Sequence, residues 1–205
     1  MMISINVFLP YRCRQKEEPG MKVTKAQVEA NRAHIVDTAC TLFRERGYDG
    51  VGVAELMATA GLTHGGFYRH FGSKAELMAE AAAYSFAQSN SQMSDFDIVS
   101  FVQKYLSREH RDAPGNGCTM AALCADAGRH SEPLKETFLT GIENQLTSLS
   151  NGSESTTEER KAKINAIAHA VGALVLSRSC PDDSLLADEI LDVCREEIIT
   201  NLEAK

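Results

Sequence analysis

Residues 53–77 constrain the fold of this chain more than any other segment. They form the pattern of a short helix, a turn containing glycine, a second short helix and a third helix with a capped start. The first helix has apolar residues at the i, i+3, i+4, i+7 spacing of one buried face. The residues of this stripe are Val53, Leu56, Met57 and Ala60. Gly61 follows, where a tight turn favours a residue without a Cβ atom. The pattern predicts a helix-turn-helix, whose second helix can enter the DNA major groove.

The second helix of this motif is predicted to run from Thr63 to Phe71. Thr63 is a suitable N-cap, because its hydroxyl can accept a hydrogen bond from the N–H of Gly65 or Gly66. A phenylalanine pair four residues apart, Phe67 and Phe71, should anchor one face to the core. At 1.5 Å per residue the helix would be roughly 13 Å long, which suits a groove about 12 Å wide. The opposite face then carries His64, Tyr68, Arg69 and His70.

Two glycines and a lysine in this region oppose local helix preferences. Gly65 and Gly66 each cost roughly 1 kcal/mol relative to alanine inside a helix. They indicate either a loose helix start or a place where a nucleic-acid backbone comes close. Ser73 to Glu76 forms a capping box, so Lys74 stands at a helix N-terminus, where a cation is unfavourable. Lys74 is therefore either a solvated surface lysine or part of an anion site that suits a DNA phosphate.

These residues resemble the N-terminal DNA-binding domain of the tetracycline-repressor (TetR/AcrR-type) regulator family. The resemblance covers roughly Gln27 to Met78 and is specific at three short motifs. They are Ala60-Gly61-Leu62-Thr63, Tyr68-Arg69-His70-Phe71 and Ser73-Lys74-Ala75-Glu76-Leu77. One position departs from the family pattern, because Gly52 stands where a threonine or serine usually caps the first helix of the motif.

The resemblance implies an all-α fold, with a three-helix DNA-binding domain followed by a helical domain for effector binding and dimerisation. It implies that Tyr68, His70 and Lys74 contact phosphates, and that His64 to Gly66 and Arg69 face bases. Thr63, at the start of the same helix, joins this expected DNA-binding set. The expected partners are double-stranded operator DNA, a second copy of the chain and a small-molecule effector.

The distribution of charge agrees with a small DNA-binding domain joined to a larger body. Of the 205 residues, residues 1–78 hold ten Lys/Arg and eight Asp/Glu, a net charge of +2, and residues 79–205 hold eleven and twenty, a net charge of −9. The expected domains are a flexible arm at residues 1–23, a DNA-binding domain (the head) at 24–78 and an effector-binding and dimerisation domain (the body) at 79–205. A basic N-terminal part joined to an acidic body favours binding in which the head faces the DNA. Arg12, Arg14 and Lys16 in the arm could reach a minor groove, or translation could start at Met21.

Cysteine usage and hydropathy favour a cytoplasmic protein. The six cysteines form no C-x-x-C pair, no apolar run is long enough to span a membrane, and the first residues do not form a signal peptide. The cysteines are at positions 13, 40, 118, 124, 180 and 194.

The sequence predicts no cofactor and no metal site. An enzyme is not expected, because the one polar cluster that could serve, His110, Cys118 and Asp126, shows no ordered pair of nucleophile and base.

Helix signals continue along the chain. A capping box at Thr24 to Gln27 opens a helix that should stop at Gly47, and residues 110–117 are predicted to be a loop. Further helices are expected at about 73–90, 95–107, 118 onward, 131–150, 157–179 and 184–202, with a polar loop at 151–155. The last two helices, one rich in Ala and Gly, predict a homodimer through a four-helix bundle, or else an intramolecular pair.

The body offers candidate effector-binding residues. Apolar and aromatic residues at helical spacing could line a pocket, although such residues are often plain core, and His169 could bond a ligand or be a satisfied core or interface histidine. The candidates are Phe101, Tyr105, Met120, Leu123, Phe138 and His169. Cys118 follows a Gly-rich segment at a predicted helix start, a setting that favours the thiolate. It is either a redox-sensing candidate or a small buried hydrophobe.

The sequence therefore predicts a DNA-binding transcriptional regulator, and in particular a dimeric repressor released by a small-molecule effector. The alternative is a repressor that senses electrophiles or oxidants through Cys118. A DNA-binding protein that acts constitutively, without an effector, is a third hypothesis.

Overall fold

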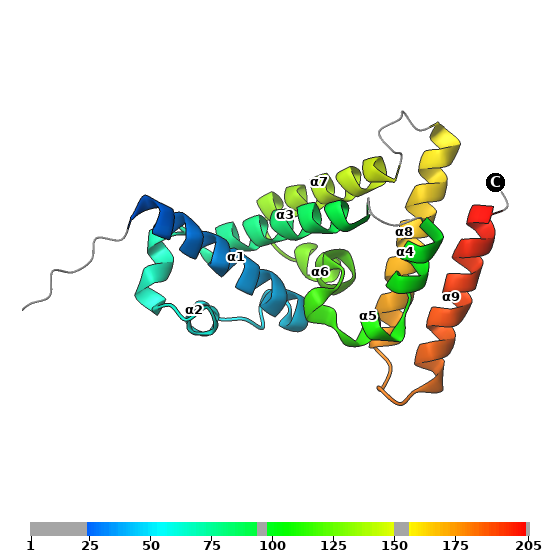
Figure 1. Cartoon of the computed structure of the whole chain (residues 1–205), viewed down its shortest axis with the longest axis horizontal. Coiled ribbons are helices and arrows are strands. Elements are labelled where there is room, and N and C mark those ends of the chain that lie inside the picture. The colour runs from blue at the N-terminus through cyan, green and yellow to red at the C-terminus, as the bar shows by residue number, and fades with distance from the viewer. Residues whose placement is uncertain (1–23, 94–97, 150–155, 204–205) are drawn as a thin grey trace, which may run out of the picture.

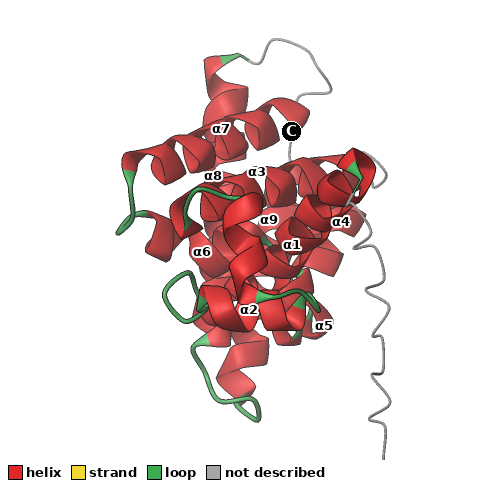
Figure 2. Cartoon of the chain, turned by 90° about the vertical axis from the view of Figure 1, so that its left-hand side faces the viewer, coloured by secondary structure: helices red, strands yellow, loops and turns green. Residues whose placement is uncertain are grey.

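The computed structural model describes residues 24–93, 98–149 and 156–203, and every regular element in them is helical (Figure 2). The predicted all-α fold is thus confirmed. The expected arm at residues 1–23, the predicted polar loop at 151–155 and the alternative start at Met21 lie outside the described residues.

The head is built from α1 (Lys25–Arg46), α2 (Val53–Thr59), the 3₁₀-helix η1 (His64–Arg69) and the first turns of α3 (Lys74–Met93). α1 begins as predicted, because the Thr24 hydroxyl accepts a hydrogen bond from the Gln27 N–H. It ends at Gly47, whose φ of 73° favours glycine. Gly61, with φ 69°, likewise makes the turn between α2 and η1. Gly52 makes no side-chain cap for α2, as its identity predicts.

The second helix of the motif differs from the prediction. It is a 3₁₀-helix over His64–Arg69, and the Thr63 hydroxyl makes no capping hydrogen bond. The Thr63 carbonyl accepts from the Gly66 N–H instead, at 2.9 Å. The segment is short and holds two glycines, which are poor helix formers, so the tighter i→i+3 pattern replaces an α-helix. At about 2.0 Å per residue its six residues still span roughly 12 Å.

The body continues with α4 (Ile98–Tyr105), α5 (Arg108–Asp112), η2 (Pro114–Asn116), α6 (Thr119–Ala127), α7 (Glu132–Ser148), α8 (Thr157–Arg178) and α9 (Leu185–Glu203). The loop predicted at residues 110–117 is therefore mostly helical. Ser107 caps α5, since its hydroxyl accepts from the His110 N–H, and the buried Arg111 side chain fixes α5 to the end of α8. The capping box of α8, between Thr156 and Glu159, is confirmed with both of its hydrogen bonds.

The elements form an elongated molecule with the helix-turn-helix at one end and the α8–α9 pair at the other (Figure 1). α3 and α7 run side by side between the two ends. One hydrophobic core begins under the helix-turn-helix with Phe43 and Phe67 and continues to Phe86 and Phe138 in the body. It crosses the boundary predicted at residue 78, so the head is packed onto the body. A second core joins α4, α8 and α9 through Leu106, Leu174 and Leu191.

Candidate DNA-binding site

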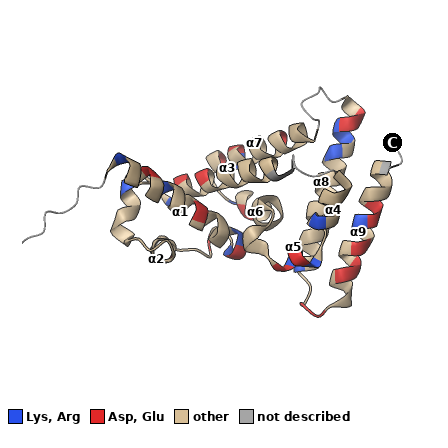
Figure 3. Ribbon diagram, viewed as in Figure 1, with Lys and Arg blue, Asp and Glu red and all other residues tan. Residues whose placement is uncertain are grey.

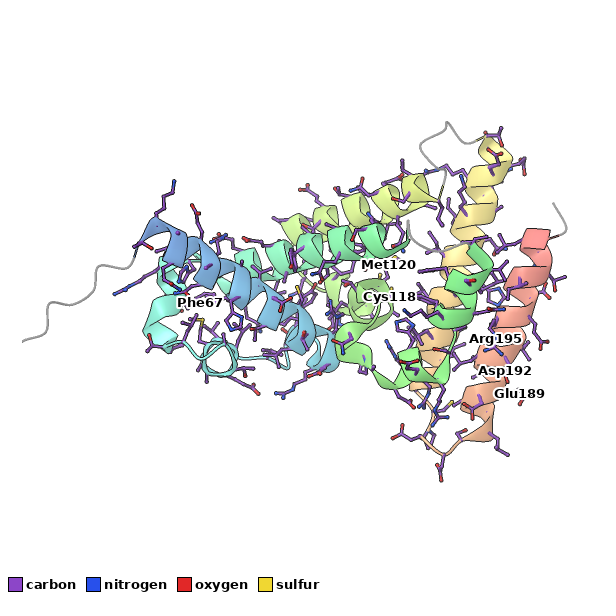
Figure 4. All side chains as sticks on the ribbon, viewed as in Figure 1. Phe67, Cys118, Met120, Glu189, Asp192 and Arg195 are labelled. Carbon is purple, nitrogen blue, oxygen red and sulfur yellow. The ribbon has the colours of Figure 1, made fainter. Side chains whose placement is uncertain are left out.

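Two phenylalanines anchor η1 to the head. Phe67 and Phe71 are 0% and 2% exposed, and their rings stack at a centroid distance of 5.5 Å. Phe67 lies within the head and points toward its core (Figure 4). Because these two side chains face inward, other residues of η1 face outward. Tyr68 is 66% exposed, and His64 and Arg69 are also exposed. Residues expected to contact bases, His64 and Arg69, are thus exposed together with Tyr68, which is expected to contact a phosphate.

Arg32 of α1 holds the end of η1 in place, and sequence reasoning did not single it out. Its guanidinium lies over the Phe71 ring at 4.2 Å, donates to the His70 carbonyl and pairs with Glu76 and Glu80 of α3. One side chain therefore joins α1, η1 and α3. In the sequence, Arg32 is one cation within a predicted helix. Its contacts with residues 38 to 48 positions away could not be predicted from that.

Lys74 has a partner within the protein. Its ammonium donates to the Tyr48 carbonyl at 2.5 Å, and the residue is partly buried. The prediction that Lys74 contacts a phosphate stays untested, but the group also tethers α3 to the segment after α1. The capping box at this helix start is altered. Ser73 accepts from the Glu76 N–H as predicted, whereas the Glu76 carboxylate accepts from the Gly72 N–H at 2.8 Å.

His70 differs from the other expected contact residues because it is partly buried. Its Nδ1 atom is buried without a hydrogen-bond partner. Burial lowers the pKa of His70, and the nearby charges of Arg32 and Arg69 lower it further. In the protein without DNA these effects disfavour the charged imidazolium. A phosphate beside the ring would act in the opposite direction.

Nothing inside the protein requires glycine at the start of η1. A Cβ atom at Gly65 would meet no atom within 4 Å, and one at Gly66 would make only ordinary contacts, the nearest at 3.5 Å to the Thr63 hydroxyl. Neither residue has a positive φ. The open space lies on the exposed surface of η1, which leaves room for a close approach from outside.

The described part of the head carries no net charge. Residues 24–78 hold six Lys/Arg and six Asp/Glu, so the predicted excess of +2 comes entirely from the four Lys/Arg and two Glu of residues 1–23. Acidic side chains are spread along α9, at the end far from the helix-turn-helix (Figure 3). The predicted orientation of DNA binding then depends on repulsion by the acidic body as well as on the basic residues of the arm.

The candidate effector residues do not form one site. Phe101 and Tyr105 line a cavity of about 360 Å³ in the body. Met120 lies beside a second, apolar hollow of about 230 Å³ against α8. Leu123 and Phe138 are 3% and 5% exposed. Both belong to the first hydrophobic core, which packs the head onto the body. His169 is partly exposed on α8 and lines neither space.

Cys118 lies at the wall of the larger cavity, as the N-cap of α6 (Figure 4). The residue is partly buried, and its backbone N–H donates to Nε2 of His110 at 3.2 Å. Asp126 is not part of this group. It accepts from the Tyr48 N–H and pairs with Arg129. Among the residues that the structure describes, the partners of Asp126 are thus Tyr48 and Arg129, and not His110 or Cys118.

Within residues 24–93, 98–149 and 156–203, no three His, Cys, Asp or Glu side chains gather in a way that could hold a metal ion. None of the helices that the structure describes is both long and apolar enough to cross a membrane.

Fold and site together define a class. A helix-turn-helix with an outward-facing 3₁₀-helix, packed on a helical body with a cavity, is the architecture of a DNA-binding transcriptional regulator. Residues 35–81 match the family model described as "Bacterial regulatory proteins, tetR family". The segment that holds the helix-turn-helix is thus similar in sequence to the DNA-binding domain of the tetR family.

Relatives of known name agree with this assignment. The chain is 37% identical to the HTH-type transcriptional regulator AcrR of Shigella flexneri over 57 residues, 28% of this chain and 26% of AcrR. It is 29% identical to the HTH-type transcriptional repressor NemR of Escherichia coli K12 over 133 residues, 60% of this chain and 67% of NemR. The HTH-type transcriptional repressor DhaR of Mycobacterium sp. GP1 is 26% identical over 114 residues, 53% of this chain and 58% of DhaR.

Solved structures show the same fold. The reduced form of Escherichia coli NemR matches with a TM-score of 0.68 at 20% identity, over 82% of this chain and 95% of NemR. A TetR transcriptional regulator of Chloroflexus aurantiacus matches with a TM-score of 0.69 at 22% identity, over 87% of this chain and 96% of that protein.

Proposed function

We propose that the protein is a dimeric transcriptional repressor that binds a two-fold symmetric operator and releases it when a small molecule occupies the body. The observation that supports this most strongly is the placement of η1. Phe67 and Phe71 fix it to the core, so that His64, Tyr68 and Arg69 all face outward. The relatives NemR and DhaR are named repressors, which favours repression over activation.

The proposed DNA contacts combine phosphate and base recognition. Tyr68, His70 and Lys74 would contact phosphates, and Arg69 with the segment from Thr63 to Gly66 would face bases. A guanidinium on an exposed 3₁₀-helix can bond two acceptors of a guanine edge, whereas a phosphate contact carries no sequence information. Such a protein works in the compartment that holds the DNA, which for a bacterial regulator is the cytoplasm.

The proposed dimer uses the outer faces of α8 and α9. These helices pack against each other through the second core, and their other faces expose large apolar side chains. Four of them are Val175, Leu176, Leu186 and Val193, between 44% and 58% exposed. A second copy that covers this surface would form a four-helix bundle and would place the two heads for two half-sites.

The test begins with selection of duplexes from a random DNA pool by the purified full-length protein. Fluorescence anisotropy on the selected duplex should then show specific binding that weakens steeply with salt. Arg69→Ala should change which sequences are selected. Binding of all duplexes with equal affinity by the wild-type protein would contradict a sequence-specific repressor.

A thiol sensor is the second candidate, and the position of Cys118 favours it. Cys118 lies at a cavity wall, whereas Cys40 is 3% exposed and burial raises the pKa of its thiol. Burial also raises the pKa of Cys194. Mass spectrometry after limited N-ethylmaleimide treatment should find Cys118 modified before Cys40 and Cys194, and the treated protein should release its operator. Equal release from Cys118→Ser would exclude Cys118 as the sensor.

A further inference from the structure

The larger cavity has an aromatic wall. Phe101 and Tyr105 of α4 are 5.7 Å apart between ring centroids, and the His110 ring lies 4.8 Å from that of Tyr105. His110 has both ring nitrogens engaged. Because Nε2 accepts from the Cys118 N–H, the proton is on Nδ1, which donates to the Tyr105 carbonyl at 2.6 Å. The wall is therefore flat, neutral and fixed in orientation.

The charged group inside this cavity is Arg44, from the last turn of α1. Its guanidinium is partly buried and donates to the Gly115 carbonyl at 2.8 Å and to the Ser85 hydroxyl at 2.9 Å. Both acceptors are neutral, and no carboxylate of the described residues forms an ion pair with Arg44. The other two charged residues of the lining, Lys104 and Glu109, have opposite signs and are exposed. The Arg44 guanidinium thus has no ion-pair partner, although the charges of Asp37 and Glu45 act on it from a greater distance.

One further donor nearby lacks an acceptor. The Nη1 atom of Arg178 is buried without a hydrogen-bond partner, whereas the buried Tyr105 hydroxyl lies beside the Cys118 thiol. The remaining guanidinium nitrogens of Arg178 donate to the carbonyls of Arg111 and His110, which are also neutral. Arg178 lies against the cavity residue Gly117, since its Nη2 would be 3.1 Å from a Cβ atom there. Buried donors and cations without acceptors are costly, so this region favours a ligand with acceptor oxygens and negative charge.

We propose that the effector is an organic acid with a flat aromatic body, whose carboxylate pairs with Arg44 while its ring packs against Phe101 and Tyr105. This inference rests on the proposed function, because it assigns the chemical class of the effector. A cavity of about 360 Å³ has room for a one- or two-ring acid. A bidentate bond to a guanidinium without a carboxylate partner supplies both charge and direction.

Arg44 also connects this cavity to the DNA-binding head. It belongs to α1, the helix that Arg32 fastens to η1, and it holds the Gly115 carbonyl of η2. The contact between α1 and η2 is close, because a Cβ atom at Gly115 would lie 2.5 Å from the Glu45 carboxylate. A carboxylate that binds the Nε and Nη2 edge of the Arg44 guanidinium replaces the Gly115 carbonyl as the acceptor of the Nε–H. Effector binding therefore loosens the junction through which the body positions the head.

The test compares acids with their own uncharged amides. Benzoate, 2-naphthoate and 4-phenylbenzoate are titrated into the full-length protein by calorimetry, each beside its carboxamide, which has nearly the same shape. At least one acid should bind about ten- to a hundredfold more tightly than its amide, the range expected for a charge-assisted hydrogen bond. If no acid binds more tightly than its amide, the proposal is overturned. None of these compounds is an electrophile, so modification of Cys118 cannot produce the effect.

Variants of Arg44 test whether this residue causes the tighter binding of the acid over its amide. Arg44→Gln should remove the preference for acid over amide, and Arg44→Lys, which keeps the charge, should restore part of it. Arg46→Gln is the matched control, because Arg46 is an exposed cation on the same helix that pairs with Glu55, and it should keep the full preference. Thermal unfolding of each variant checks its fold. A preference that survives in folded Arg44→Gln would overturn the role of Arg44.

Measurements of operator release distinguish failure of the acid site from failure of the proposed repressor function. Wild-type protein on its selected duplex should be released by the preferred acid and not by the amide, and Arg44→Gln should stay bound in both. If the wild type binds no duplex specifically, the repressor proposal fails, while the calorimetry still decides the acid site. If the acid binds through Arg44 without releasing the duplex, the coupling through α1 is wrong.

Discussion

At the scale of single residues, Arg69 and Lys74 are two cations of the same candidate surface with different surroundings. Arg69 is exposed on η1, and Lys74 is partly buried with its ammonium on the Tyr48 carbonyl. The exposed Arg69 side chain can adjust its position to a base edge, whereas the Lys74 ammonium is held at the start of α3 by the Tyr48 carbonyl. The two should therefore contribute differently to DNA binding.

Alanine at each position should separate these contributions. Arg69→Ala should relax base preference at one or two positions, at a cost of about 1–3 kcal/mol on the preferred sequence if its contact is bidentate. Lys74→Ala should weaken binding to all sequences and reduce the slope of log K against log salt by about one unit. Anisotropy titrations over a salt series on preferred and altered duplexes measure both. An unchanged sequence preference in Arg69→Ala would make Arg69 a mere surface charge.

His110 predicts a pH dependence of stability. Burial lowers the pKa of His110, and the charges of Arg178 and Lys104 lower it further, although the bond to the Tyr105 carbonyl opposes this. As pH falls below about 6.5, the unfolded chain gains a proton that the folded state resists, so stability falls as pH decreases. Between pH 7 and 5 the melting temperature of the wild type should drop more than that of His110→Gln. The exposed His34→Gln is the control and should follow the wild type.

At the scale of elements, helix ends and apolar stripes were predictable, and the contacts between elements were not. Thr24, Gly47, Gly61 and Thr156 act locally, through caps and turns within a few residues, and all four were predicted correctly. The 3₁₀ form of η1 was missed, because a short segment with two glycines has no strong periodicity. Arg32 and Arg44 were missed because each acts on residues dozens of positions away, to which a single sequence gives no signal.

The packing of α3 on α7 depends on one such contact. A Cβ atom at Gly141 of α7 would lie 2.4 Å from the Phe86 ring, which Phe138 holds edge-on at 5.3 Å. Gly141→Ala should therefore destabilise the protein, because an overpacking cost of about 1–3 kcal/mol exceeds the gain of roughly 1 kcal/mol in helix propensity. Denaturant unfolding measures this. Gly65→Ala is the control, since the space there is open, and a similar loss of stability in both would contradict the steric explanation.

At the scale of the whole molecule, the proposed DNA-binding surface on η1 and the proposed dimer surface on α8 and α9 lie at opposite ends (Figure 1). A dimer through the latter surface explains why Leu176 and Val193 are each 58% exposed in the single chain. Leu176→Glu should give a folded monomer in light scattering after size exclusion. Leu139→Glu is the control, because Leu139 is 62% exposed on α7, away from the proposed interface, and should leave the dimer intact. A Leu176→Glu protein that stays dimeric would place the interface elsewhere.

In the proposed complex, two copies of η1 bind one two-fold symmetric site, and a comparison of full and half operators tests this arrangement. Hydroxyl-radical footprinting on the selected duplex should show two protected half-sites related by a two-fold axis, with centres a whole number of helical turns apart. Anisotropy should show that a duplex with one half-site scrambled binds far more weakly than the full duplex. A single protected segment, with equal affinity for the half and full sites, would contradict the account.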